Sequence, residues 1–150
     1  MRNGVRLGID VGDVRIGVAR SDPHGLLASP VEVVRAGSGA LDQLRLLVAE
    51  HEPIEVLVGL PIGLRGAEGR AAAKAREFAA SLRAVLTVPV RLVDERFSTV
   101  SAHQAYRSQG QSTRQTRERI DAAAAAVFLQ GALDTERNTN FPPGEEVEVS

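Results

Sequence analysis

The sequence contains no cysteine and few aromatic residues, and these absences exclude several kinds of function. Without cysteine the chain cannot form disulfides, zinc ribbons, iron–sulfur clusters or thiolate nucleophiles. Four Phe and one Tyr leave few rings on which the bases of a single-stranded nucleic acid could stack. No apolar run approaches the roughly 18 residues of a membrane span, and the N-terminal segment lacks the apolar core of a signal peptide. We therefore expect a cytoplasmic protein that does not enter a membrane.

Length and composition predict one globular domain. The 150 residues are too few for two well-buried domains, and 43% hydrophobic with 25% charged residues is typical of a soluble globular chain. The last helix pattern ends near residue 133, and residues 138–150 contain a Pro-Pro-Gly sequence and three Glu. We expect a folded domain over residues 1–137 and a disordered acidic tail over residues 138–150.

The net charge is −1, but the charges are unevenly distributed along the chain. Residues 134–150 hold five acids and one Arg, so they carry −4 and the remaining residues carry +3. Between residues 96 and 119 a single Glu accompanies five arginines: Arg96, Arg107, Arg114, Arg117 and Arg119. Arginine binds phosphate bidentately, so this segment fits a nucleic-acid backbone. A solvated helix face is the alternative.

Hydrophobic periodicity predicts an α/β fold with a mixed sheet and helices on both faces. Two short alternating runs separated by Gly12-Asp13 indicate a β-hairpin, and Pro30 marks the third strand as an edge strand. The first three strands are therefore expected to be antiparallel, and β-α-β units follow them. The expected strands cover residues 5–11, 15–19, 26–34, 54–60 and 88–93, and the expected helices cover residues 41–52, 71–86, 99–108 and 114–133.

Acidic residues lie at three places where catalytic or metal-binding carboxylates are commonly found. Asp10 interrupts an apolar strand, Asp94 and Glu95 follow a buried strand, and Asp121 opens an alanine-rich stretch of helix. Ligands of α/β proteins bind at the carboxyl ends of strands, and carboxylate oxygens suit Mg²⁺ or Mn²⁺. If the sheet brings these acids together, two such ions could activate a water and stabilise the leaving oxygen in phosphodiester hydrolysis.

Each acid also has a structural explanation. Asp10 could cap the turn after its strand, and Asp121 could be a solvent-facing helix residue. Asp94 and Glu95 could form a surface charge cluster with Arg96. Adjacent strand residues point to opposite faces, so only one of Asp94 and Glu95 faces a shared site unless the strand has already ended. The sequence leaves that choice open.

Other common catalytic arrangements are absent from the sequence. The three His, at positions 24, 51 and 103, lie in unrelated polar contexts and do not predict a Ser-His-Asp triad. The glycine-rich stretch at residues 63–70 lacks the Lys-Ser/Thr of a phosphate-binding P-loop, so it is predicted to be a loop.

Several short motifs occur in order over residues 5–133. They are GIDVG at residues 8–12, RIGVA at 15–19, VGLP at 58–61, DERFST at 94–99 and IDAAA at 120–124. Together they resemble the YqgF (RuvX) family of bacterial Holliday-junction resolvases, which are also described as nucleases that process the 5′ end of pre-16S rRNA. The resemblance implies an RNase H-like fold and a divalent-metal nuclease. By motif, the acidic residues of such a site are Asp10, Glu95 and Asp121.

We therefore expect a Mg²⁺- or Mn²⁺-dependent endonuclease that acts on a structured rRNA precursor or branched DNA. Asp10, Glu95 and Asp121 are its expected catalytic and metal-binding residues, with Asp94 as the substitute for Glu95. The expected substrate-binding residues are Arg15, Arg96, Arg107, Arg114, Arg117 and Arg119. The sequence does not choose between DNA and RNA, because both present the same phosphates, or between a monomer and a homodimer.

Two functions of other classes stay open. One is a non-catalytic RNA-binding factor of ribosome assembly on the same fold, which would bind RNA in EDTA and cut nothing. The other is an actin-like phosphate or nucleotide binder, because the opening GxDxG hairpin also occurs in that related fold. Tight, Mg²⁺-dependent ATP binding would favour the second.

Overall fold

A six-stranded mixed sheet forms the centre of the protein in the computed structural model. The structure describes residues 1–63, 66–95 and 114–148, with the backbone alone for residues 114–118. The strands are β1 (Arg6–Val11), β2 (Arg15–Ser21), β3 (Ala28–Arg35), β4 (Glu55–Leu60), β5 (Val90–Asp94) and β6 (Glu145–Glu146). The helices are α1 (Ala40–His51), α2 (Arg70–Val85) and α4 (Arg114–Thr139). The helix expected at residues 99–108 lies outside the described residues.

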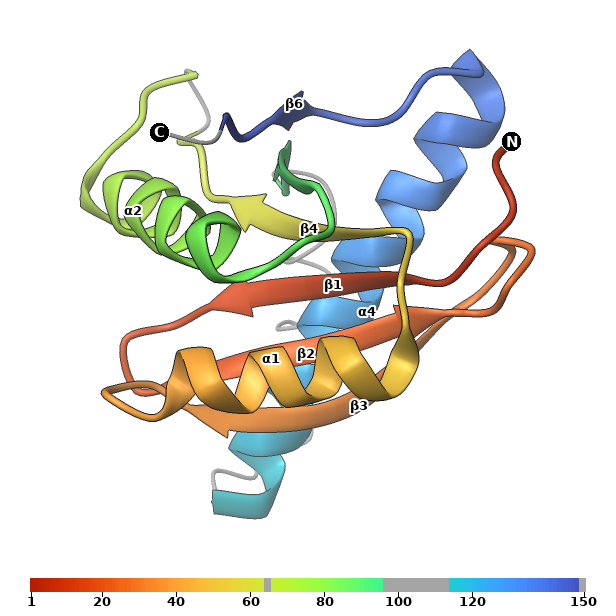
Figure 1. Ribbon diagram of the computed structural model, residues 1–150. Coiled ribbons are helices and arrows are strands. Elements are labelled where there is room, and N and C mark those ends of the chain that lie inside the picture. The colour runs from red at the N-terminus through yellow and green to blue at the C-terminus, as the bar shows by residue number, and fades with distance from the viewer. Residues whose placement is uncertain (64–65, 96–113, 149–150) are drawn as a thin grey trace.

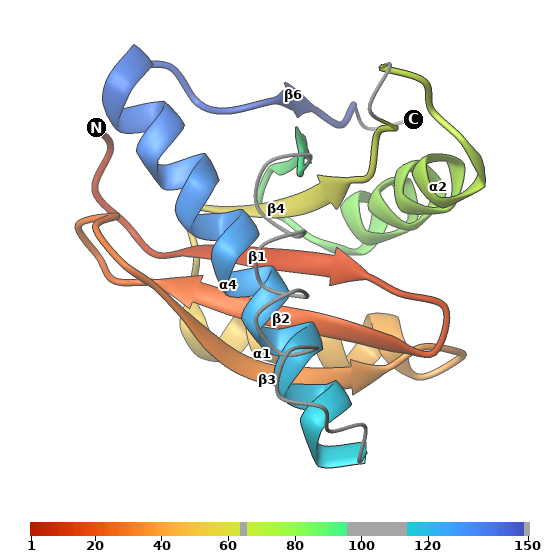
Figure 2. The same ribbon diagram turned by 180° about the vertical axis from the view of Figure 1, so that it is seen from behind.

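The strand order confirms the predicted topology. Strands follow one another as β3-β2-β1-β4-β5-β6; β1, β2 and β3 are antiparallel, whereas β1–β4 and β4–β5 are parallel pairs. Helices α1 and α2 lie on one face of the sheet (Figure 1), and α4 crosses the opposite face (Figure 2). β3, which contains Pro30, is an edge strand as predicted.

The alternation of side chains along β1 assigns its residues to the two faces. Leu7 and Ile9 are buried in the core cluster that includes residues of α1 and α2. Gly8 points to the other face, where a Cβ atom would come within 2.9 Å of the Leu129 side chain on α4. Since successive strand residues alternate between faces, Asp10 lies on the α4 face with Gly8.

Helix α4 approaches the sheet closely because small residues line the contact. Ala124 and Ala125 are fully buried, and the backbone of Asp121 lies against Gly17 of β2, where any Cβ atom would overlap the Asp121 carbonyl. Glycine in a strand interior commonly marks such a close approach. The alanine-rich stretch of α4 therefore packs closely against the sheet, and it brings Asp121 onto the hairpin of β1 and β2.

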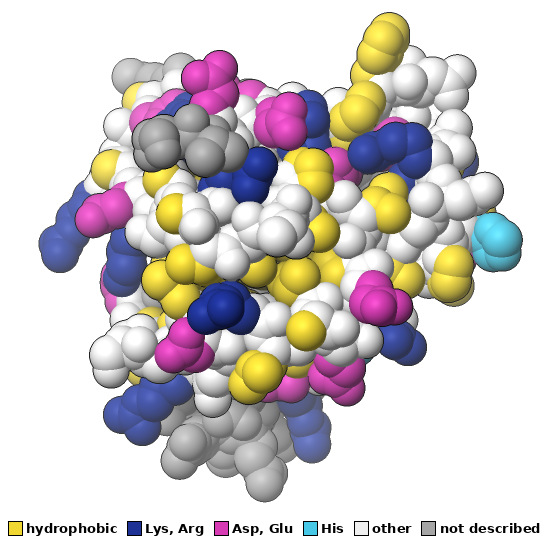
Figure 3. All heavy atoms as spheres, in the orientation of Figure 1, with side chains coloured by type: hydrophobic (Ala, Val, Ile, Leu, Met, Phe, Trp, Pro, Cys, Tyr) yellow, Lys and Arg dark blue, Asp and Glu magenta, His cyan; other side chains and the backbone are white. Residues whose placement is uncertain are grey.

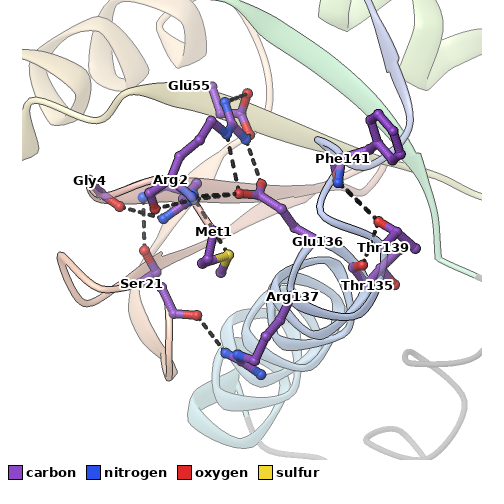
Figure 4. A network of polar contacts seen from close by, with 12 residues as sticks. Met1, Arg2, Gly4, Ser21, Glu55, Thr135, Glu136, Arg137, Thr139 and Phe141 are labelled. Carbon is purple, nitrogen blue, oxygen red and sulfur yellow. Dashed lines mark hydrogen bonds and ion pairs between the residues drawn. The ribbon is translucent and has the colours of Figure 1, made fainter.

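Buried ion pairs fix the carboxyl half of α4 to the sheet (Figure 4). Arg6 on β1 and Glu136 on α4 are almost fully buried, and Nη2 of Arg6 lies 2.9 Å from Oε2 of Glu136. Arg2 contacts Glu136 at 2.6 Å and the buried Glu55 of β4 at 2.7 Å. Burial alone would raise the pKa of Glu136, but hydrogen bonds from Arg2 and the charge of Arg6 hold it below its usual range.

Residues 138–148 correct the expectation of a disordered tail. α4 continues to Thr139, and β6 pairs antiparallel with β5, with Glu145 opposite Leu92. The Arg91 guanidinium donates hydrogen bonds to the carbonyl oxygens of Pro143 (2.7 Å) and Gly144 (2.9 Å). An edge strand exposes backbone groups that can pair with another segment. β5 therefore orders a segment whose own composition predicts no structure.

Acidic and basic side chains are interspersed over the face that carries α1 and α2 (Figure 3). Among the residues described by the structure, no helix combines the length and apolar character needed to cross a membrane.

Candidate active site

Two acidic side chains meet at the carboxyl end of the parallel strands. Asp10 lies near the end of β1, and Glu95 directly follows β5. Gly59 of β4 lies between them, because Ile9 pairs with Val58 and Gly59 pairs with Val93. The Glu95 carboxylate lies over Gly59, where any Cβ atom would overlap its Oε2 atom. The missing side chain at position 59 thus lets Glu95 reach across β4 toward Asp10.

The choice that the sequence left open falls on Glu95. Its side chain is buried on the α4 face beside Asp10, whereas Asp94 is exposed at the end of β5. Val93 packs with α4 residues, and Glu95 shares its side of the strand because it is two positions further along. The backbone N–H of Glu95 still donates to the Leu60 carbonyl oxygen (3.3 Å), which continues the strand direction to this residue.

The proximity of Asp10 and Glu95 favours the binding of a cation. The pKa of Glu95 is raised to about 8, mainly by burial and then by the charge of Asp10 and a side-chain hydrogen bond with Asp10. The charge of Asp94 contributes a smaller part. A neighbouring carboxylate disfavours the ionised form of Glu95, and a bound cation would remove that penalty. At neutral pH Glu95 is therefore mostly protonated unless a cation replaces its proton.

Asp121 lies one strand away and is held by Arg15. Its backbone carbonyl lies on Gly17, which is paired with Asp10 across β1 and β2. Its Oδ2 atom accepts a hydrogen bond from Nε of Arg15 at 2.6 Å. Within the described residues, no three acidic or histidine side chains are grouped as a complete metal site. The structure thus brings Asp10 and Glu95 together, and it places Asp121 on the neighbouring strand pair, where it is hydrogen-bonded to Arg15.

The other arginines expected to bind substrate are only partly described. Arg119 is exposed on α4. Arg114 and Arg117 belong to the first turns of the same helix. Arg96 and Arg107 lie outside the described residues.

Sequence reasoning missed the two glycines that shape the site. Gly59 accommodates Glu95, and Gly17 accommodates the backbone of Asp121. Each lies between apolar residues in the interior of a strand. This was the available signal, because glycine in a strand interior weakens the strand and commonly marks a place where another group comes close.

The donor set fits a hard divalent cation. Asp10 and Glu95 offer carboxylate oxygens in a partly buried place where their charges repel each other. Mg²⁺ and Mn²⁺ prefer carboxylate oxygens as ligands. Asp121 lies further away and already accepts a hydrogen bond from Arg15 through its Oδ2 atom. Asp10 and Glu95 are therefore the residues most directly placed to hold a cation.

Comparisons of sequence relate the chain to nucleases and resolvases. The sequence model of the family described as "RuvX: Holliday junction resolvase" matches residues 4–135. A protein of Thermobifida fusca (strain YX) named "Putative pre-16S rRNA nuclease" is 57% identical over 156 residues, which cover 99% of this chain and 98% of that protein. A protein of the same name from Nocardioides sp. (strain ATCC BAA-499 / JS614) is 58% identical over 154 residues, which cover 99% of each chain.

The fold is also similar to that of a solved resolvase. The structure described as "T. thermophilus RuvC in complex with Holliday junction substrate" aligns over 96% of this chain and 99% of its own, with a TM-score of 0.50 and 17% identity. At this identity the similarity concerns the fold alone. It confirms the RNase H-like fold that the family resemblance implies.

Proposed function

Because the chain belongs to the RuvX family, we propose that it is a divalent-metal-dependent endonuclease that processes the 5′ end of pre-16S rRNA. The observation that carries this proposal is the placement of Glu95 against Asp10 at the carboxyl end of the sheet. The names of its relatives support the rRNA precursor. The family description supports a branched DNA junction as the second substrate to test.

Asp10 and Glu95 would hold Mg²⁺ or Mn²⁺, and Asp121 would join them as a third ligand. A bound divalent ion would polarise a water and neutralise the charge that develops on the phosphodiester. The fold positions these carboxylates. Gly59 leaves the space that Glu95 needs, and the packing of α4 on Gly17 brings Asp121 to the hairpin.

Arg15 would orient the substrate at the same hairpin. Its guanidinium now contacts Asp121 and is partly exposed, so a phosphate oxygen could replace the carboxylate as its hydrogen-bond acceptor. The arginines expected to extend this contact along the nucleic acid are Arg96, Arg107, Arg114, Arg117 and Arg119. Their charges would lower the affinity for nucleic acid as salt rises, because binding to phosphates releases counterions.

A cleavage assay of wild type and Asp10→Asn tests the function. The substrates are a pre-16S 5′-leader RNA and a four-way DNA junction, each with Mg²⁺, Mn²⁺ or EDTA. Asp42→Asn is the matched control, because Asp42 is an exposed acid on α1 whose side chain is 80% accessible. We expect metal-dependent cutting of the RNA by wild type and by the control, and none by Asp10→Asn.

Other outcomes of the assay separate the rival functions. Cutting of the junction alone would change the substrate and keep the metal site. Equal cutting by Asp10→Asn, in preparations free of other nucleases, would remove the site. RNA binding in EDTA with no cutting under any condition would instead favour a non-catalytic ribosome-assembly factor.

A further inference from the structure

A cavity of about 360 Å³ opens at the β1–β2 hairpin, on the opposite face of the sheet from Asp10. Its floor is apolar and includes Val11, Ile16 and Phe78, which belong to or pack against the core cluster on the α1 and α2 face. Its rim carries Asp13, from the hairpin turn, and Lys74 from α2. We refer to this cavity as the hairpin pocket. Its volume lies within the range of about 300–1,000 Å³ that is common for small-ligand sites.

The rim of the hairpin pocket places a cation beside an aromatic ring. Lys74 and Phe78 are four residues apart on α2, so they lie on the same side of the helix. Lys74 is the single lysine of the chain, and its Nζ atom lies 2.6 Å from Oδ1 of Asp13. The hydrogen bond and charge of Lys74, with a smaller contribution from Arg70, lower the pKa of Asp13. One acid therefore faces two basic residues here.

This combination of groups matches the chemistry of a nucleotide. A base can stack on an aromatic ring whatever its identity, and an ammonium group binds phosphate as a point charge. The ion pair between Lys74 and Asp13 is exposed, with 44% and 89% of the two side chains accessible. Exposed pairs of this kind contribute little to stability, so a phosphate can compete for Lys74.

The hairpin pocket lies next to the candidate active site along the same strand. Asp10 and Gly12 are separated by one residue, which corresponds to roughly 7 Å of extended backbone. Val11, between them, points to the pocket face while Asp10 points to α4. A nucleic-acid strand whose cleaved phosphate is at Asp10 and Glu95 could reach the pocket with a neighbouring nucleotide by crossing the end of β1.

We propose that the hairpin pocket binds the nucleotide adjacent to the cleaved phosphate, with its base against Phe78 and its phosphate on Lys74. This inference rests on the proposed nuclease function, which identifies the bound strand as the nucleic-acid substrate. A base held in this way is removed from its stack, so the substrate is single-stranded on that side of the cut.

The single lysine provides a direct probe of the pocket. Reductive methylation with ¹³C-formaldehyde labels Lys74 and the N-terminal amine and keeps their positive charges, and Lys74→Gln identifies the lysine signal. The labelled full-length protein is titrated in EDTA, which prevents metal-dependent cleavage. The ligands are a short single-stranded RNA, the same RNA in a duplex, and a free nucleoside 5′-monophosphate. We expect the Lys74 signal to shift at lower concentration with the single strand than with the other two ligands.

Binding of the single-stranded RNA by four variants tests the roles of the side chains. Lys74→Gln should weaken binding about tenfold, because it removes a charge-assisted contact. Phe78→Leu keeps an apolar side chain but removes the ring, and should weaken binding about fivefold. Asp13→Asn frees Lys74 and should tighten binding up to about fivefold. Arg45→Gln removes an exposed charge from α1 and should leave affinity within about twofold.

The opposite signs expected for Lys74→Gln and Asp13→Asn exclude a merely structural ion pair. The pocket assignment is overturned if both variants bind as wild type does, or if Arg45→Gln loses as much affinity as Lys74→Gln. A free nucleotide that binds more tightly than the strand would overturn it as well. Because these measurements are made in EDTA, they can fail while Asp10→Asn still abolishes cleavage. That result would remove the pocket proposal and leave the proposed function intact.

Discussion

Glu95 reaches Asp10 because position 59 has no side chain. The carboxylate crosses β4 above Gly59, and its burial beside a second acid raises its pKa to about 8. A carboxyl group with this pKa is mostly protonated at neutral pH, so a cation that binds here must displace a proton. We therefore expect the affinity for Mg²⁺ or Mn²⁺ to rise with pH.

The same residue predicts how stability depends on pH in the absence of metal. The pKa of Glu95 is about 8 in the folded protein and near 4.5 when exposed. Between these values the folded state binds a proton that the unfolded state has released, so the contribution of Glu95 to stability is lost as pH rises. Glu95→Gln stays neutral. The free energy of unfolding of Glu95→Gln, relative to that of wild type, should therefore increase from pH 5 to above pH 8, by at most about 5 kcal/mol. Urea unfolding in EDTA measures this difference, and a constant difference across that range would contradict it.

Gly59→Ala tests whether the position of Glu95 matters for cleavage. The added Cβ atom would overlap Oε2 of Glu95 and push the carboxylate away from Asp10. We expect cleavage to fall about 100-fold, because displacements of about 1 Å have effects of that size. Gly131→Ala is the matched control, since nothing lies within 4 Å of a Cβ atom there. Far-UV circular dichroism checks that both variants fold, and equal cleavage by the two variants would count against the role assigned to Gly59.

Hydrophobic periodicity predicted most of the strands and helices. The helix expected at residues 71–86 is observed as α2, Arg70–Val85, and the edge position of the third strand followed from Pro30. These features depend on local alternation of side chains, which a sequence shows directly. The pairing of β6 with β5 depends instead on backbone groups of a distant strand. The composition of the tail does not indicate that it pairs with β5, and the tail was therefore predicted to be disordered.

The sequence predicted which acidic residues form the candidate site, but only part of how they are arranged. Asp10 and Asp121 were found because each acid interrupts an apolar or alanine-rich run. The choice between Asp94 and Glu95 needed the strand register, since one position changes the face of the sheet. The contact between Arg15 and Asp121 joins residues 106 positions apart, so no local pattern could indicate it.

The position of α4 depends on Glu136, at the opposite end of the helix from Asp121. Glu136→Gln would leave the buried guanidinium of Arg6 without the carboxylate that faces it at 2.9 Å. Breaking a buried pair by removing one partner costs about 3–5 kcal/mol, and urea unfolding should show a loss of that size. Glu145→Gln is the control, because its pair with Arg76 is exposed and should contribute less than about 1 kcal/mol. Similar losses for the two variants would mean that the buried network does not anchor the helix.

Both proposed nucleic-acid contacts lie at the carboxyl ends of the parallel strands. Asp10 and Glu95 lie on the α4 face, and the hairpin pocket with Lys74 lies on the α2 face. The net charge of −1 gives no general attraction to polyanions. Binding must therefore depend on where the basic side chains lie, and acidic residues near the site should oppose it.

The acids of the C-terminal segment are placed to give such opposition. β6 pairs with Arg91 and Leu92 of β5, the strand that ends at Asp94. Replacing Glu145, Glu146 and Glu148 by Gln changes the net charge from −1 to +2. It should tighten RNA binding about fivefold at low salt, with the gain disappearing once the Debye length falls to a few ångströms. Replacing Glu32, Asp42 and Glu50 by their amides changes the net charge equally, on β3 and α1. Fluorescence anisotropy should show a smaller gain for this control, and equal gains would mean that net charge alone, and not the location of the segment, governs affinity.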